Sequence, residues 1–176
     1  MADCGTILMV IPARGGSKRL PRKNVRPLAG KPLICWTIES ALATGLNARI
    51  LVTSDDNEIL VLAGDYESQG VIAHRRPSEL ATDTAGTADA LIEAVEAEQK
   101  AGYAPDTLVL LQPTSPFRNA GDILAAIKVF EETGCNDMVV KKHAISLGHG
   151  VFILCWCGKR NSCQALYRPT DQGPVF

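Results

Sequence analysis

Short, continuously apolar segments alternate along this chain with longer segments in which apolar residues recur at helical spacing. The apolar segments, such as 6–11 (TILMVI) and 107–111 (TLVLL), have the length of strands and lack the apolar–polar alternation of a half-exposed sheet. They therefore indicate strands that are buried on both faces. Strands of this kind alternating with helices are typical of α/β proteins. We predict a three-layer α/β fold with a mostly parallel open sheet and helices on both faces.

The same pattern gives approximate positions for the elements. The first helix is expected to start near Pro32 and to end at Gly45, and the second to start at the D-x-x-E signal of Asp55 and Glu58. Two more helices are expected over 87–100 and 123–132, and strands over 6–11, 49–53, 71–73, 107–111 and 137–140, with a further candidate at 151–156.

The regular alternation is confined to residues 1–140. A chain of 176 residues suits one domain with one core, so we assign 1–140 to a single α/β domain. Residues 141–176 lack a clear period, and the chain stops at 173–176 (GPVF) without a capping element. We therefore treat 141–176 as an irregular C-terminal segment and expect a C-terminally truncated chain.

The composition is that of an ordinary globular protein and disfavours several classes. Apolar residues make up 46% of the chain, charged residues 21%, and the formal net charge is −1. This balance argues against a disordered or fibrous protein, and the lack of a basic excess argues against nucleic acid as the main partner. No apolar run approaches the roughly 20 residues that cross a bilayer, and the first residues lack a secretion signal. We expect a cytoplasmic protein with no nucleic-acid or membrane partner.

Six cysteines, at positions 4, 35, 135, 155, 157 and 163, admit two interpretations. In a chain without an export signal, free thiols are expected rather than a disulfide framework. The alternative is a zinc cluster, which is disfavoured because the spacing matches no paired C-x-x-C site. The residues of that alternative are His143, His149, Cys155, Cys157 and Cys163.

Basic residues are concentrated in one stretch near the start of the chain. No acidic residue occurs from Cys4 to Ile38, and this stretch holds seven of the 18 basic residues. A near-neutral protein with one such stretch is suited to holding a compact anion rather than to coating a polymer. The seven are Arg14, Lys18, Arg19, Arg22, Lys23, Arg26 and Lys31.

This basic stretch falls in a glycine- and proline-rich loop, 12–30, that follows the first predicted strand. Ligands of open α/β sheets bind at the carboxyl ends of the strands, so the loop is a candidate binding site. Gly15 and Gly16 permit positive φ and close approach of a ligand, and with Ser17 their amides could form an anion-binding nest. The loop matches neither G-x-x-x-x-G-K-[ST] nor G-x-G-x-x-G. The alternative is a solvated basic turn, which would leave its cations without a local counter-charge.

Two further loops at predicted strand ends carry polar residues. Gln112 directly follows the strand at 107–111, where it could hydrogen-bond a base or a sugar; a rigid turn that only caps a helix is the alternative. The loop 75–87 (RRPSELATDTAGT) offers hydroxyls that could contact a ribose or cap the next helix. Ser54 and Asp55 also follow a strand, and capping of the next helix explains them.

Four of these segments together resemble the acylneuraminate cytidylyltransferases, also called CMP-sialic acid synthetases. They lie in the family's order within residues 6–140. The resemblance implies a nucleotide-diphospho-sugar transferase-like fold, with 1–140 as a nucleotide-binding domain and 141–176 at the start of a dimerisation or sugar-binding part. The segments are 11–24 (IPARGGSKRLPRKN), 52–56 (VTSDD), 75–87 (RRPSELATDTAGT) and 110–118 (LLQPTSPFR).

The resemblance also implies a reaction. The anomeric hydroxyl of a sialic-acid-like 2-keto sugar acid attacks the α-phosphate of CTP, and pyrophosphate leaves. Such an enzyme must neutralise the triphosphate and hold attacker and leaving group in line. Carried over by position, Arg14, Lys18 and Lys23 are catalytic, with Lys23 acting on charge developing at the α-phosphate, and Gln112 faces the sugar. The implied nucleotide-binding residues are Ala13, Arg14, Gly15, Gly16, Ser17, Lys18, Asn24, Arg76 and Thr87.

Mg²⁺ as cofactor and a homodimer are further implications of the resemblance. The family holds Mg²⁺ with aspartates beyond the position equivalent to Phe176, so no metal ligand is identified in this chain. Two alternatives to an active sialic-acid-type transferase therefore stand. One is a catalytically incomplete fragment that binds nucleotide. The other is a Kdo or other sugar-acid cytidylyltransferase, because the Kdo enzymes share a shorter form of the first loop.

Overall fold

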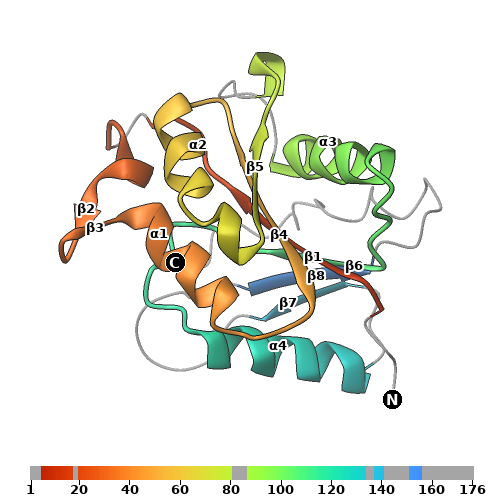
Figure 1. Ribbon diagram of the computed structural model, residues 1–176. Helices are drawn as coiled ribbons and strands as arrows, with labels where there is room; N and C mark the ends of the chain where they lie inside the picture. Colours follow the sequence, from red (N-terminus) through yellow and green to blue (C-terminus); the bar gives the residue numbers. More distant parts are fainter. Residues whose placement is uncertain (1–4, 18–19, 81–86, 134–136, 141–150, 156–176) are drawn as a thin grey trace, which may run out of the picture.

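A six-stranded sheet forms the centre of the protein (Figure 1). The computed structural model describes residues 5–17, 20–80, 87–133, 137–140 and 151–155, the last two segments through their backbone. The strands, in their order across the sheet, are β5 (Val71–Arg75), β4 (Ala48–Ser54), β1 (Ile7–Pro12), β6 (Thr107–Leu110), β8 (Val151–Cys155) and β7 (Asp137–Val140).

The sheet is mostly parallel, which confirms the prediction. β5, β4, β1 and β6 pair in parallel with their neighbours, whereas β8 is antiparallel to both β6 and β7. β8 comes after residue 140, where we placed the end of the α/β domain, yet it lies inside the sheet between β6 and β7. The sheet thus draws on residues up to Cys155.

Helices cover both faces of the sheet, so the predicted three layers are confirmed. α1, α2 and α4 pack with one core cluster, and α3 packs with a second cluster on the opposite face. In Figure 1, α3 and α4 lie on opposite sides of the central strands. The helices are α1 (Leu33–Leu42), α2 (Asn57–Gly64), α3 (Thr87–Lys100) and α4 (Ala120–Thr133).

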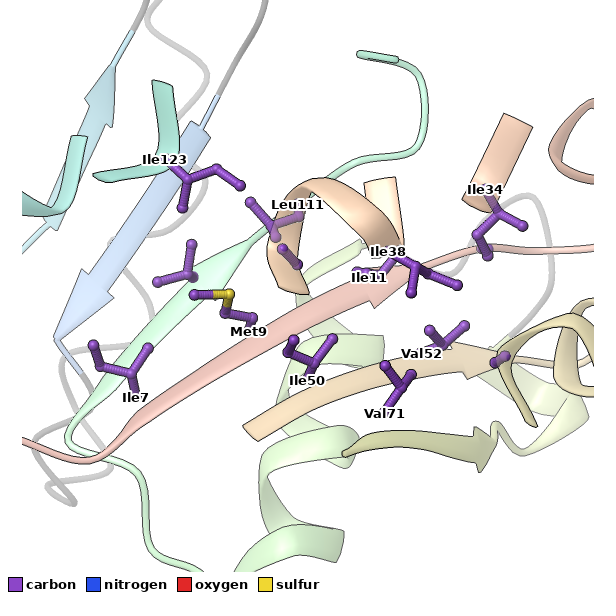
Figure 2. Packing of buried hydrophobic residues seen from close by; sticks show 14 of the residues in the cluster. Ile7, Met9, Ile11, Ile34, Ile38, Ile50, Val52, Val71, Leu111 and Ile123 are labelled. Atoms are coloured by element: carbon purple, nitrogen blue, oxygen red, sulfur yellow. The ribbon is translucent and has the colours of Figure 1, made fainter. Parts of the chain in front are cut away.

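The burial of β1 on both faces explains why its sequence lacks an alternation of apolar and polar residues. Ile7, Met9 and Ile11 point into the core shared with α1, α2 and α4, as Figure 2 shows, whereas Leu8 and Val10 belong to the core beneath α3. All five side chains are buried. Because successive residues of a strand point to opposite faces, only a strand covered on both sides needs such a run.

Short elements occupy the connections. The loop after β1 contains a 3₁₀ turn, η1 (Lys23–Val25), and a two-residue hairpin made by β2 (Pro27–Leu28) and β3 (Lys31–Pro32). Two further 3₁₀ turns flank β5: η2 (Glu67–Gln69) before it and η3 (Ser78–Leu80) after it.

The structure tests the expectations about cysteines and membrane segments only for the described residues. Cys35 is a buried free thiol, as predicted. Cys155 is described only through the backbone of β8, and the remaining cysteines lie outside the described residues, as do His143 and His149. Among the described residues, no helix has both the length and the apolar character that crossing a membrane requires.

The packing of α2 predicts a difference in stability between two of its residues. Ile59 is 1% exposed and belongs to the core, whereas Val61, on the same helix, is 66% exposed. We expect Ile59→Ala to lower the free energy of unfolding by about 2–5 kcal/mol, and Val61→Ala to change it by less than about 0.5 kcal/mol. Urea denaturation of both variants measures this. Equal effects would contradict the placement of α2.

Candidate active site

The strand order reverses at β1, and ligands of open α/β sheets bind outside the carboxyl ends of the strands at such a point. The chain passes from β1 to β4 on one side and later adds β6 on the other side. The pairing of Pro12 with Thr53 and of Val10 with Leu110 brings the carboxyl ends of β4, β1 and β6 to one edge. The glycine loop, the segment at Asp55 and the Gln112 loop therefore all start at this edge.

The Thr53 carbonyl joins two of the predicted nucleotide-binding segments. It accepts a hydrogen bond from the Ala13 amide at 3.0 Å and another from Nη2 of Arg76 at 2.9 Å. Nε of Arg76 also donates to Oγ1 of Thr53 at 3.3 Å. Ala13 and Arg76 are both buried. The structure thus brings together two residues that the sequence separates by more than 60 positions.

Two cations of the predicted site, Lys23 and Arg76, lie near enough to Arg14 to be repelled by it. Burial, followed by repulsion from the Arg14 guanidinium, lowers the pKa of the Lys23 ammonium below its ordinary value. Burial also lowers the pKa of Arg76; the Asp55 and Glu93 carboxylates oppose this shift and Arg14 adds to it. Cations held close together and partly desolvated are costly to the free protein, and a bound polyanion relieves this cost.

The conformation of the loop around Arg14 is held from inside by Asn24. Asn24 is buried on η1, and its Nδ2 donates to the Arg14 carbonyl at 3.0 Å. The next turn is fixed from outside by Arg22, which has a left-handed backbone with φ of 59° and an ion pair to Asp56 at 2.5 Å. A second ion pair joins Arg22 to Glu58. The loop is therefore braced against the start of α2.

Asp55 has a different role from the one that we expected. The N-cap of α2 is Asp56, whose Oδ1 accepts from the amides of Glu58 and Ile59. Oδ1 of Asp55 instead accepts from the Gly15 amide at 3.1 Å. The capping interpretation of Asp55 is wrong, because one carboxylate already satisfies those amides. The signal in the sequence was the pair of consecutive aspartates, since only one of them can cap the helix.

The glycines of the loop are also used differently from the prediction. Neither Gly15 nor Gly16 has a positive φ, so the two do not form an αR–αL nest here. Glycine is required at position 15 by close packing: a Cβ there would lie 2.4 Å from Oδ2 and 2.8 Å from Cβ of Asp56. At position 16 a Cβ would meet nothing within 4 Å. The loop backbone is thus packed at Gly15 and open at Gly16.

Gln112 lies at the same edge, in a loop with its own anchor. The amide of the preceding Leu111 donates to the Val10 carbonyl at 2.9 Å, which continues the pairing with β1. The Gln112 carbonyl accepts from Nη2 of Arg118 at 3.4 Å, and the Arg118 carbonyl accepts from Oγ of Ser40 on α1 at 2.8 Å. Arg118 is 1% exposed, and burial lowers its pKa to about 10 against the opposing effect of Asp122. The loop of Gln112 is therefore anchored by a buried cation, and this anchoring is compatible both with the predicted contact of Gln112 to a ligand and with the alternative of a rigid turn.

Three further residues were predicted to bind the nucleotide, and two of them lie within the described residues. Ser17 is half-buried in the glycine loop, and Thr87 is exposed at the first position of α3. Lys18 lies outside the described residues. The described residues contain no group of three or more His, Cys, Asp or Glu side chains that could hold a metal ion. They therefore do not by themselves fit the Mg²⁺ that the resemblance implies.

Curated proteins of similar sequence act on sugar acids. The chain is 40% identical to the CMP-N,N′-diacetyllegionaminic acid synthase of Legionella pneumophila over 163 residues. The matched region covers 93% of this chain and 66% of that protein. It is 38% identical to the N-acylneuraminate cytidylyltransferase of Escherichia coli, over 71% of this chain and 28% of that protein. It is also 38% identical to a pseudaminic acid cytidylyltransferase of Campylobacter jejuni, over 70% of this chain and 52% of that protein. The predicted resemblance is thereby confirmed.

A solved structure and a family model agree with these relatives. The structure of a CMP:2-keto-3-deoxy-manno-octonic acid synthetase complexed with CTP matches with a TM-score of 0.61 and 26% identity, over 75% of this chain and 50% of that one. The chain thus spans two thirds or less of the length of each of these proteins. A cytidylyltransferase family model matches residues 8–153. This match covers most of the α/β sheet with its three candidate loops, and the chain therefore belongs to the cytidylyltransferase family.

Proposed function

We propose that the protein is a nucleotidyltransferase that transfers CMP from CTP to the anomeric hydroxyl of a sialic-acid-like 2-keto sugar acid. The observation that carries this proposal is the gathering of Arg14, Lys23 and Arg76 at the carboxyl edge of the sheet in a chain of this family. The names of the relatives, which specify acylneuraminate, legionaminic and pseudaminic acids, support a sugar acid as the acceptor.

In this reaction the anomeric oxygen forms a bond to the α-phosphorus, and the bond from that phosphorus to the pyrophosphate oxygen breaks. The hydroxyl proton is released, and pyrophosphate carries away the electron pair of the broken bond. The contribution of the protein is mainly positioning and electrostatic stabilisation. Lys23 is suited to the charge that develops at the α-phosphate, because its partly desolvated ammonium interacts more strongly than a fully hydrated one.

The open part of the glycine loop is the proposed contact for the phosphates. Among the described residues, none accepts a hydrogen bond from the amides of Gly16 and Ser17, whereas the Gly15 amide is taken by Asp55. The free space at Gly16 would let a phosphate approach the backbone closely. Arg14 would add charge on the same side, and Arg76, fixed on Thr53, would help to hold the nucleoside.

A Kdo-type acceptor is a second candidate. The solved CMP:2-keto-3-deoxy-manno-octonic acid synthetase shares the fold at 26% identity, and its sugar acid differs from the acceptors named in the other relatives. The described nucleotide side is compatible with either acceptor. Comparing turnover with several sugar acids separates the two.

Two properties implied by the resemblance, and a cellular location inferred from the sequence itself, remain part of the proposal. Mg²⁺ would supply further neutralisation of the triphosphate when bound. A homodimer is proposed on the same basis. A cytoplasmic location is proposed because the buried thiol of Cys35 fits a reducing compartment.

The first prediction tests the transfer itself. The protein, given CTP, Mg²⁺ and N-acetylneuraminate, should release pyrophosphate and form a CMP-sugar in equal amounts. A coupled phosphate assay and chromatography of the nucleotide products measure both. Binding of CTP in calorimetry without any turnover on N-acetylneuraminate, legionaminate, pseudaminate or Kdo would instead identify a nucleotide-binding fragment.

The second prediction concerns Lys23. Lys23→Ala should lower kcat by about 10²–10³-fold while raising the Kd for CTP by less than about tenfold, because its proposed contact strengthens in the transition state. The fold should not be weakened, since the ammonium is desolvated and repelled by Arg14. Because the pKa of Lys23 is lowered, activity should fall as the pH rises through that pKa. Lys23→Arg should move this fall to higher pH. Equal losses in kcat and CTP affinity would contradict the assigned role.

The third prediction compares the two loop glycines. Gly15→Ala should lower the free energy of unfolding by about 1–3 kcal/mol, because the new Cβ overlaps Asp56. Gly16→Ala should leave stability within about 0.5 kcal/mol yet weaken CTP binding, because the methyl group occupies the space proposed for phosphate. Thermal unfolding and CTP titration of both variants measure this. A Gly16→Ala protein with unchanged CTP affinity would exclude the proposed phosphate contact.

A further inference from the structure

We propose that Asp55 is a positioning residue for the nucleotide loop: by holding the Gly15 amide, its carboxylate keeps Arg14, Gly16 and Ser17 in the arrangement that receives the triphosphate. This assignment rests on the proposed function and adds to it a residue that contacts no substrate. Oδ1 of Asp55 lies 3.1 Å from the nitrogen of Gly15, which stands in the chain between Arg14 and Gly16.

The Asp55 carboxylate is available for this role because neighbouring side chains bind the backbone amides at the start of α2. Asp56 caps α2, and Oγ of Ser54 accepts from the Asp56 amide at 3.0 Å. The carbonyl of Asp55 lies 3.5 Å from Nη1 of Arg75, so the backbone is also tied to the end of β5. The Asp55 side chain thus connects the end of β4 with a loop 40 residues away in sequence.

The charge of Asp55 also requires an explanation, because a carboxylate beside a triphosphate site repels the ligand. Two features offset this cost. The carboxylate accepts a hydrogen bond from the Gly15 amide, and its charge opposes the lowering of the pKa that burial causes at the Arg76 guanidinium. Since the Gly15 amide is occupied, phosphate oxygens are directed to the next amides of the loop, those of Gly16 and Ser17. Asp55 therefore selects which part of the loop meets the ligand.

The opposite end of β1 carries a matched control. Oδ2 of Asp106 accepts from the Thr6 amide at 2.8 Å and from Oγ1 of Thr6 at 2.9 Å. As with Asp55 and Gly15, a carboxylate from a neighbouring segment binds a backbone amide next to β1. Thr6 precedes β1, however, whereas Gly15 follows it, so Asp106 lies at the edge away from the loop. Removing Asp106 should affect stability without changing the nucleotide site.

The experiment compares Asp55→Ala, Asp55→Asn and Asp106→Ala in the full chain. CTP affinity is measured by calorimetry, and exchange of the Gly15 amide is measured by NMR without nucleotide. We expect Asp55→Ala to raise the Kd for CTP about tenfold and to speed Gly15 exchange by at least about tenfold, because a hydrogen bond to a charged acceptor is lost. Asp55→Asn keeps an acceptor oxygen and should recover CTP affinity to within about threefold of the unaltered protein. Asp106→Ala should lower Tm and leave both site measurements unchanged.

Several results would overturn the assignment. Unchanged or tighter CTP binding by Asp55→Ala would mean that the carboxylate only repels phosphate. Failure of Asp55→Asn to recover affinity would mean that charge alone matters, and equal weakening by Asp106→Ala would mean a general loss of stability. If the unaltered protein binds no CTP, the proposed function and this assignment both fail. If it binds CTP and the three variants do not differ, only this assignment fails.

Discussion

The burial of β1 on both faces is the constraint on which the rest of the structure depends. A strand that points Met9 to one side and Leu8 to the other needs helices on both faces, and it needs pairing strands on both edges. Those pairings, with β4 and β6, bring three carboxyl ends together at the edge where the strand order reverses. The candidate site is therefore a consequence of how the most apolar strand is covered.

The fold also determines which basic residues of the stretch 14–31 form ion pairs. In the sequence the loop has no local counter-charge, but in the structure Arg22 meets Asp56 and Glu58 on the start of α2, and Lys31 meets Glu39 on α1. The pKa of Lys23 is lowered by burial and by repulsion from the Arg14 guanidinium. Folding thus pairs Arg22 and Lys31 with carboxylates at the start of α2 and on α1, and it brings Lys23 near Arg14, where we propose that the anion binds.

How much could be predicted from the sequence depended on whether the signal was local. The strands and helices follow from apolar periodicity, and the meeting of the candidate loops at one edge follows from their position after strands, so both were predictable. The division of labour between Asp55 and Asp56 was not, because it depends on how the loop after β1 packs against α2. The same packing, rather than a positive φ, explains Gly15. The place of β8 inside the sheet depends on strand pairing, which no pattern within 151–155 encodes.

The two sides of the proposed site are held by separate sets of contacts. On the nucleotide side, Thr53 binds Ala13 and Arg76. Asp55 binds Gly15, and Asn24 binds Arg14. The proposed acceptor side, the loop of Gln112, is anchored through Arg118 and Ser40 on α1. Within the described part of the chain, these two sets of contacts share no residue, so a change in the loop of Gln112 need not disturb the contacts that hold the nucleotide loop. This independence is consistent with relatives that all have cytidylyl or CMP in their names while their sugar acids differ.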